Sequence, residues 1–192
     1  MLRRLALAAV LLPSALAQAG MPPEVAVAPG LIAMAHPVDC ASFASVAAWA
    51  AGHGYRFPPG DGRCEGRGGG DPAFGVGWNT AAAWADALSE RAGLVPAYRA
   101  PDGAPVRDAL PLGLVPSLAA GASGYRLPML RELGLPGLRS RMGRLQEWTG
   151  TRIDLGDGRP YYYQCRPGAC DFHSPGTSLR GVGFRLLRAV AP

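Results

Sequence analysis

The stretch that decides the fold is Phe74–Arg99, which reads FGVGWNTAAAWADALSERAGLVPAYR. Its apolar residues recur at the i, i+3, i+4 and i+7 spacing that places side chains on one face of a helix. The residues at this spacing are Ala81, Trp84, Ala85 and Leu88. The stretch therefore predicts a short extended segment that ends at Trp78, then an amphipathic helix, then a loop.

The polar residues of the same stretch indicate where this helix begins and ends. We expect Asn79 or Thr80 to cap its first turn, because a side-chain oxygen there can accept a hydrogen bond from an unpaired backbone N–H. We expect Gly93 to end it, because glycine suits the backbone of a helix stop. The face opposite the apolar one then carries the polar side chains Asp86, Glu90 and Arg91.

Three shorter motifs follow this stretch in order along the chain. They are Gly124–Pro128 (GYRLP), Gly137–Thr149 (GLRSRMGRLQEWT) and Gly183–Arg185 (GFR). With GVGWNTAAAWADALSERAGLVPAYR, they resemble the formylglycine-generating-enzyme/sulfatase-modifying-factor family. The motifs of that family read roughly G-V-S-W-x-D-A, L-S-E-R-x-G-L-x-P-x-Y, G-Y-R-L-P, G-L-Y-D-M-x-G-N-V-W-E-W-T and G-F-R. The resemblance extends from about Val38 to Arg188.

The resemblance implies an α+β, C-type-lectin-like fold with two main helices, small antiparallel sheets and much irregular loop. We expect a signal peptide at 1–17, an extended lead-in at 18–37 and the formylglycine-generating-enzyme-like domain at 38–190. Local patterns predict one strand at Leu31–Met34 in the lead-in. They also predict a second helix over about Cys40–Ala51, capped by Asp39 and ended at Gly52. The segment Tyr125–Pro128 is expected to be a buried strand end.

The N-terminus predicts export. Arg3 and Arg4 form a basic end, Leu5–Leu12 an apolar run, and Ala15-Leu16-Ala17 a small-x-small cleavage site. The apolar run is too short to span a bilayer, so we expect a periplasmic or secreted protein with no membrane span after cleavage. Loss of the two arginines lowers the formal net charge from +5 to +3. So small a charge gives no case for nucleic-acid binding.

Four cysteines in an exported chain predict two disulfides. Sequence order favours the pairs Cys40–Cys64 and Cys165–Cys170, with the other pairings left open. In the family, a Cys-x4-Cys pair binds Cu(I), which activates oxygen to oxidise a substrate cysteine to formylglycine. Cys165 and Cys170 have this spacing, and two soft thiolates suit Cu(I). They are the candidate catalytic and copper-binding residues, and a structural disulfide is the competing interpretation.

The chain departs from the family at its other functional positions. Pro160-Tyr161-Tyr162 replaces the G-G-S segment that precedes the family's cysteines. Met129–Leu135 replaces a longer helical segment, and Arg144 stands where the family's calcium-binding Asn belongs. We therefore expect no calcium site, and we expect Glu147 to pair with Arg144 or another arginine.

The remaining candidates are aromatic, histidine and serine residues. The four tryptophans are expected in the core. His173, Ser174 and Ser178 lie close in sequence, which does not make a catalytic triad. The run Tyr161–Tyr163 is expected to alternate on a strand, with the middle ring on the opposite face from its neighbours. Its rings are expected either to pack or to form an exposed patch for a protein or glycan partner.

Two functions of different classes follow. The first is an exported, non-catalytic family member that acts as a binding or accessory module and needs no cofactor. The alternative is a copper-dependent oxidase that uses Cys165 and Cys170 to convert a cysteine of a sulfatase, or another thiol, to formylglycine.

Overall fold

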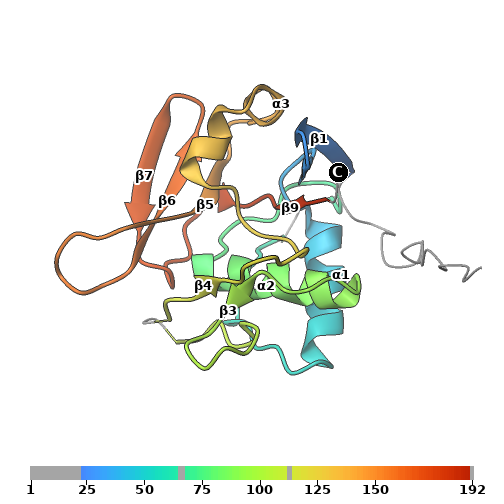
Figure 1. Cartoon of the computed structure of the whole chain (residues 1–192), viewed down its shortest axis with the longest axis vertical. Helices are drawn as coiled ribbons and strands as arrows, with labels where there is room; N and C mark the ends of the chain where they lie inside the picture. Colours follow the sequence, from blue (N-terminus) through green and yellow to red (C-terminus); the bar gives the residue numbers. More distant parts are fainter. Residues whose placement is uncertain (1–22, 65–67, 112–113, 191–192) are drawn as a thin grey trace, which may run out of the picture.

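The computed structural model describes residues 23–64, 68–111 and 114–190. The expected signal peptide at 1–17 lies outside these residues. Within them the chain forms two long helices, a short α-helix, a 3-10 helix and three small sheets (Figure 1). This mixture confirms the predicted α+β class. No helix among the described residues is long and apolar enough to cross a membrane.

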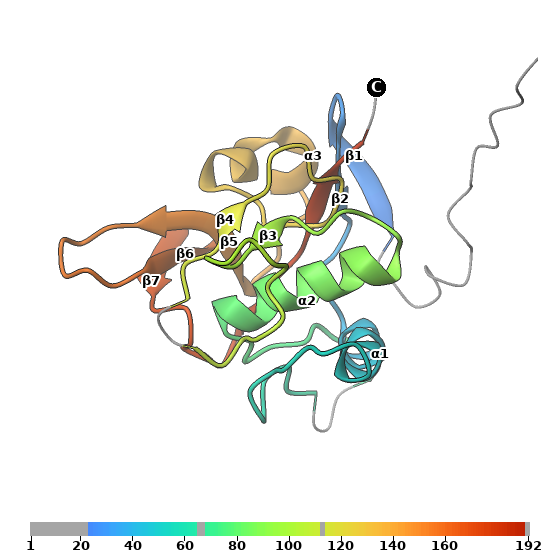
Figure 2. The same cartoon turned by 60° about the horizontal axis from the view of Figure 1, so that its bottom comes forward.

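The two long helices are α1 (Cys40–Ala51) and α2 (Trp78–Arg91), and α1 has the predicted bounds and caps. Asp39 accepts a hydrogen bond from the Ser42 backbone N–H at 2.7 Å, and the helix ends at Gly52. Figure 2 views α1 nearly end-on beneath α2, so the two helices cross steeply. Their contact is apolar, with the Phe43 ring stacked on Trp84 at 6.1 Å between centroids.

The start of α2 is set by a distant loop, and the predicted N-cap is wrong. The cap is Gly77, which has no side chain that could accept a hydrogen bond, and the helix starts at Trp78. Asp61, 16 residues earlier in the chain, accepts the Gly77 N–H at 3.1 Å and also the Thr80 hydroxyl. A carboxylate from a distant loop therefore does what a local cap was expected to do. Gly93 follows the last turn with φ +71°, as expected of a helix stop.

The polar face of α2 is covered by other parts of the chain, because every residue from Trp78 to Ser89 is buried. Asp86 is fully buried, and its carboxylate accepts the N–H groups of Tyr98 and Val106, both at 2.9 Å. Ser89 likewise accepts the N–H of Tyr125 at 2.8 Å. The irregular segment that follows α2 therefore wraps around the helix and binds its polar side.

The first sheet brings the two ends of the described chain together. Its strand order is β1 (Glu24–Ala28), β2 (Leu31–Met34) and β9 (Leu187–Ala189), all antiparallel. The strand at Leu31–Met34 is the one that was predicted, whereas β1 was not. Residues 23–37, expected as an extended lead-in, are thus a hairpin paired with the far end of the domain.

The middle of the chain is largely irregular. A two-residue pair, β3 (Tyr98–Arg99) with β4 (Ser117–Leu118), closes the loop after α2. The GYRLP segment follows, and Arg126 forms an isolated bridge to Leu187. A 3-10 helix, η2 (Leu130–Gly134), and the short α3 (Pro136–Arg139) come next.

The largest sheet holds the site described below. Its strand order is β7 (Ala169–His173), β6 (Tyr161–Arg166), β5 (Gln146–Ile153) and β8 (Val182–Gly183). The pairs are antiparallel except for the short parallel pair β5–β8. In Figure 1 the β5–β6 connection and β7 form the outer edge of the molecule, away from both long helices.

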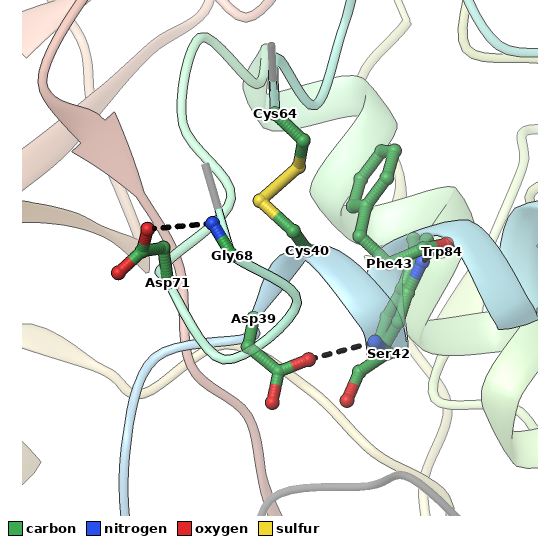
Figure 3. The surroundings of a disulfide bond; sticks show 8 residues. All are labelled: Asp39, Cys40, Ser42, Phe43, Cys64, Gly68, Asp71 and Trp84. Carbon is green, nitrogen blue, oxygen red and sulfur yellow. Dashed lines mark hydrogen bonds between the residues drawn. A yellow bond between two sulfur atoms is a disulfide. The ribbon is translucent and has the colours of Figure 1, made fainter. Parts of the chain in front are cut away.

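The disulfide Cys40–Cys64 ties the first turn of α1 to the Gly- and Pro-rich loop after it (Figure 3). The same loop is held by Asp71, which accepts the Gly68 N–H at 3.0 Å. Cys40 also donates its backbone N–H to the Asp71 carbonyl. The disulfide and these hydrogen bonds therefore hold the described part of the loop against the start of α1.

Candidate functional site

Cys165 and Cys170 lie directly opposite each other on β6 and β7 and form a disulfide. Their Cα atoms are 4.1 Å apart. This close spacing is typical of a pair that exchanges no backbone hydrogen bonds across an antiparallel ladder. The residues Arg166–Ala169 make the turn between them. With Cys40–Cys64, this gives the pairing that sequence order favoured.

The two sulfurs differ in their access to solvent. Cys165 is buried, with 1% of its surface exposed, whereas Cys170 is exposed. Glu147 of β5 is the partner of Cys165 in the ladder and is also buried. The inner half of this hairpin is thus part of the packed interior.

Glu147 forms a buried ion pair with Arg185 of the GFR motif. Arg185 donates to both carboxylate oxygens, at 2.5 and 2.7 Å, and also to the Arg141 carbonyl at 2.9 Å. The prediction that Glu147 pairs with an arginine is confirmed, and the partner is Arg185. Arg144, at the position of the family's calcium-binding Asn, has an exposed side chain.

The other candidate polar residues do not converge on one point. His173 lies 3.7 Å from Asp171, its neighbour but one on β7. Ser174 bonds to Thr177, and Ser178 donates to the Gly75 carbonyl. In the described part of the chain, no group of three or more His, Cys, Asp or Glu side chains could hold a metal ion.

The motif residues that carry the family resemblance have packing roles. Trp78 stacks on Tyr162 at 3.6 Å and donates to the Thr149 carbonyl at 2.8 Å. Trp148 is fully buried and donates to the Val76 carbonyl at 2.6 Å. The motifs therefore join α2 to β5 and β6.

Two motif glycines are required by close backbone approaches. A Cβ on Gly124 of GYRLP would lie 2.4 Å from the Val95 carbonyl oxygen. A Cβ on Gly183 of GFR would lie 2.7 Å from the Ala73 carbonyl oxygen. Backbone oxygens cannot move away as a flexible side chain can, so neither position has room for a larger residue.

The predicted alternation of the tyrosine run is confirmed. Tyr162 is buried against Trp78, and burial raises its pKa to about 12. Tyr161 and Tyr163 point to the opposite face and remain partly exposed. Phe172, opposite Tyr163 in the ladder, lies edge-on to both, at 5.9 Å from Tyr161 and 6.4 Å from Tyr163. We call Tyr161, Tyr163 and Phe172 the aromatic cluster.

Polar contacts fix the outer end of the aromatic cluster. The Tyr161 hydroxyl donates to Asp157 at 2.6 Å. This hydrogen bond raises the pKa of Tyr161 and lowers the pKa of Asp157, because it favours the phenol and the carboxylate. Arg159 lies beside the same hydroxyl and favours the ionised form of both groups.

An open groove of about 500 Å³ lies on the η2 side of β5 and is lined by Met129, Leu130, Arg131 and Thr151. Thr151 accepts the Leu130 N–H at 2.8 Å and so joins η2 to β5. Two residues further along β5, Ile153 pairs with Tyr161. The groove and the aromatic cluster are therefore connected through one short segment of β5.

Sequence reasoning found Tyr161 and Tyr163 but missed two parts of this surface. Phe172 lies in a short, five-residue strand, and only the turn at Arg166–Ala169 indicated the hairpin that brings it to Tyr163. The groove depends on η2, where the chain departs from the family motif, so no pattern in the sequence pointed to it.

Comparisons with known proteins support the fold. No protein-family model matches the chain, and no curated protein matches it in sequence. Among solved structures, CarF has a similar fold, with a TM-score of 0.73 and 24% identity over 84% of this chain and 87% of CarF. Treponema denticola variable protein 1 gives a TM-score of 0.58 and 18% identity over 83% of this chain and 84% of that protein. At these identities the likeness shows a related α+β fold alone.

Proposed function

We propose that this protein is an exported, non-catalytic binding module and that the aromatic cluster is the centre of its binding surface. The observation that carries the proposal is the grouping of three large rings, one exposed and two partly exposed, on the outer face of a paired hairpin. Phe172 alone has 37% of its surface exposed. Rigid aromatic side chains on the surface are the usual centres of binding energy in interfaces.

The proposal places the protein in the formylglycine-generating-enzyme/sulfatase-modifying-factor family, with a trimmed C-type-lectin-like fold. Two long helices, three small sheets and long irregular connections support this assignment. So do the four motifs, whose tryptophans, glycines and arginine pack the interior. A shared interior explains the resemblance without requiring a shared activity.

The chemistry of the cysteine pair favours binding over catalysis. Cu(I) binds soft thiolate sulfurs, whereas the sulfurs of Cys165 and Cys170 are bonded to each other. In this oxidised form the pair does not fit a copper ion. The same bond fixes β6 to β7 beside Tyr163 and Phe172, which is useful for a binding surface. Two disulfides also suit a periplasmic or secreted protein.

The test is site-specific photo-crosslinking in an envelope extract of the producing cell. Tyr163 is replaced by p-benzoyl-phenylalanine, which keeps an aromatic ring at that position, and Val95, with 51% exposure on the loop after α2, serves as the control position. We expect an adduct from position 163 and none from position 95. Unlabelled wild-type protein should suppress the adduct. The unlabelled Phe172→Ser variant should need a concentration at least about tenfold higher for the same suppression.

Two results would overturn the proposal. One is that position 163 gives no adduct, or only an adduct that unlabelled wild-type protein does not suppress. The other is equal suppression by wild type and by Phe172→Ser, which would place the contact away from the aromatic cluster.

The alternative function is the copper-dependent oxidase, which requires the reduced pair of thiols. The observation that favours it is the placement of Cys165 and Cys170 directly opposite each other, which keeps the two thiols adjacent after reduction. Its test is a Cu(I) competition titration of the reduced protein beside a Cys165→Ser variant, with an assay for formylglycine in a co-expressed sulfatase peptide. Tight one-to-one binding lost in the variant, together with formylglycine, would establish the oxidase.

A further inference from the structure

The face of the β6–β7 hairpin opposite to the aromatic cluster carries a histidine and an aspartate. Asp171 and His173 are two residues apart on β7, so their side chains lie on the same face of the strand. That face is the face of Tyr162, because His173 pairs directly with Tyr162 in the ladder. Both side chains are accessible, with 32% of His173 and 61% of Asp171 exposed, on the edge strand of the sheet (Figure 1).

The spacing of this pair suits two ligands of one metal ion. The His173 Nε2 and the Asp171 Oδ2 are 3.7 Å apart, which is too long for a direct hydrogen bond. Zinc binds imidazole nitrogen and carboxylate oxygen at about 2.0–2.2 Å, so two such ligands at a tetrahedral angle lie about 3.4 Å apart. The other oxygen of Asp171 accepts the Phe172 N–H at 2.8 Å. This bond orients the carboxylate, as a hydrogen bond to a metal ligand commonly does.

A third oxygen ligand is available from Gln164 of β6. Gln164 pairs directly with Asp171 in the ladder, so its side chain lies on the same face beside that carboxylate. The residue is only 2% exposed, and in the described part of the chain its side-chain oxygen has no hydrogen-bond partner. A buried amide oxygen without a partner is costly. Rotation about the terminal torsion exchanges the two ends of the amide and can turn the oxygen toward Asp171 and His173.

From this arrangement we infer that Gln164, Asp171 and His173 form a binding site for a zinc ion. One imidazole nitrogen and two oxygens are a mixed set that zinc accepts, whereas calcium and magnesium prefer oxygen alone. Only two of the three ligands are His, Cys, Asp or Glu, which agrees with the lack of larger groups of those types among the described residues. Three protein ligands leave a fourth position open to water or to a partner. The inference goes beyond the proposed function, since it concerns the other face of the hairpin.

Two arginines on the same face limit the affinity of this site. Arg166 is two residues from Gln164 on β6, and Arg152 pairs with Tyr162 from β5. Their charges repel a cation, and Asp171 supplies the one carboxylate of the ligand set. We therefore expect reversible binding that follows the concentration of free zinc.

The experiment is a calorimetric titration of the mature, oxidised, untagged protein with zinc chloride at about 0.15 M salt. We expect one ion per chain. His173→Ala and Asp171→Asn should each weaken binding at least about tenfold, and asparagine can still accept the Phe172 N–H. The matched control is His53→Ala, which removes an exposed histidine whose Nδ1 bonds to the Trp49 carbonyl. This control should change the affinity by less than about twofold.

Gln164→Leu separates a ligand from a residue that is merely buried. The substitution keeps a side chain of similar size and removes the unpartnered amide, so the melting temperature should stay the same or rise. The zinc affinity should nevertheless fall by about threefold to tenfold. In an NMR spectrum of the wild-type protein, zinc should also shift the side-chain NH₂ signals of Gln164, and this measurement does not depend on folding of the variant.

Three results would overturn the inference. The first is that zinc does not bind to the wild-type protein. The second is an equal loss of affinity in His173→Ala and His53→Ala, which identifies adventitious binding to surface histidines. The third is an unchanged affinity in folded Gln164→Leu, or NH₂ signals of Gln164 that zinc does not move, because either one removes the third ligand.

Discussion

Asp86 is an ionisable residue in the interior of the helix that decides the fold. Its side chain is fully buried, and both carboxylate oxygens accept backbone N–H groups, one from Tyr98 and one from Val106. Burial raises the pKa of Asp86 from 3.8 to about 7, and the two hydrogen bonds oppose that shift. The folded state therefore binds a proton at Asp86 more tightly than the unfolded state does.

This difference predicts how stability depends on pH. Between the unfolded pKa near 3.8 and the folded pKa near 7, protonation favours the folded state, so the contribution is gained as pH falls and lost as pH rises through 7. We expect the free energy of unfolding to gain about 1–4 kcal/mol from this group between pH 8 and pH 5. In the Asp86→Asn variant, the free energy of unfolding measured by urea denaturation should no longer show this gain between pH 8 and pH 5. An unchanged pH dependence in the variant would contradict the assignment.

The pair Arg185–Glu147 gives a second prediction at the residue scale. The two side chains are only 1% and 3% exposed. Arg185→Met leaves a buried carboxylate without its partner, which should cost about 3–5 kcal/mol of unfolding free energy. Adding Glu147→Leu removes that charge and should restore most of the loss. A double variant no more stable than the single one, by chemical denaturation, would show that the ion pair is not what stabilises this position.

Sequence reasoning identified these residues but placed only part of their surroundings. Glu147 was expected to pair with an arginine, and it does. Asp86 was expected on the face opposite Trp84 and Leu88, and its burial was not predicted. That face is covered by the segments around Tyr98, Val106 and Tyr125. Spacing within a helix carries no information about which distant segments cover it.

At the scale of elements, local rules succeeded where the causes are local. Helix α1 has its predicted bounds because Asp39 and Gly52 are neighbours of its own ends. Strand β1 and the start of α2 were missed because their partners are distant in sequence. Strand β1 belongs to a sheet completed by β9, and Asp61 binds the first turn of α2 from another loop.

The two disulfides differ in the length of chain that they close. Cys40 and Cys64 are 24 residues apart, whereas Cys165 and Cys170 are 5 apart. Closing the longer loop removes more entropy from the unfolded chain. The expected stabilisation of the folded state is about 3.5 kcal/mol for the longer loop and about 2 kcal/mol for the shorter one.

We therefore expect Cys40→Ala/Cys64→Ala to lose about 1 kcal/mol more unfolding free energy than Cys165→Ala/Cys170→Ala. Denaturation of the two double variants under identical oxidising conditions measures the difference. A larger loss from the hairpin pair would show that it constrains more than its own turn.

At the scale of the whole molecule, the family motifs explain the fold better than the function. They pack α2 against β5, β6 and β8, and this interior can persist while the surface changes. The aromatic cluster lies on that surface, where Phe172 is placed by the β6–β7 hairpin and the groove by η2. The α+β class was thus predictable from the sequence, whereas the full surface needed the hairpin register.

The central claim is that this domain binds through its aromatic cluster and does not use free thiols. The most direct measurement asks how well unlabelled Cys165→Ala/Cys170→Ala protein suppresses the crosslinked adduct formed from position 163. Thermal melting checks that this variant is folded. The account predicts suppression within about threefold of wild type, because the cluster and not the sulfurs makes the contact. Loss of suppression by a folded variant would contradict the account and return the cysteine pair to the centre of the function.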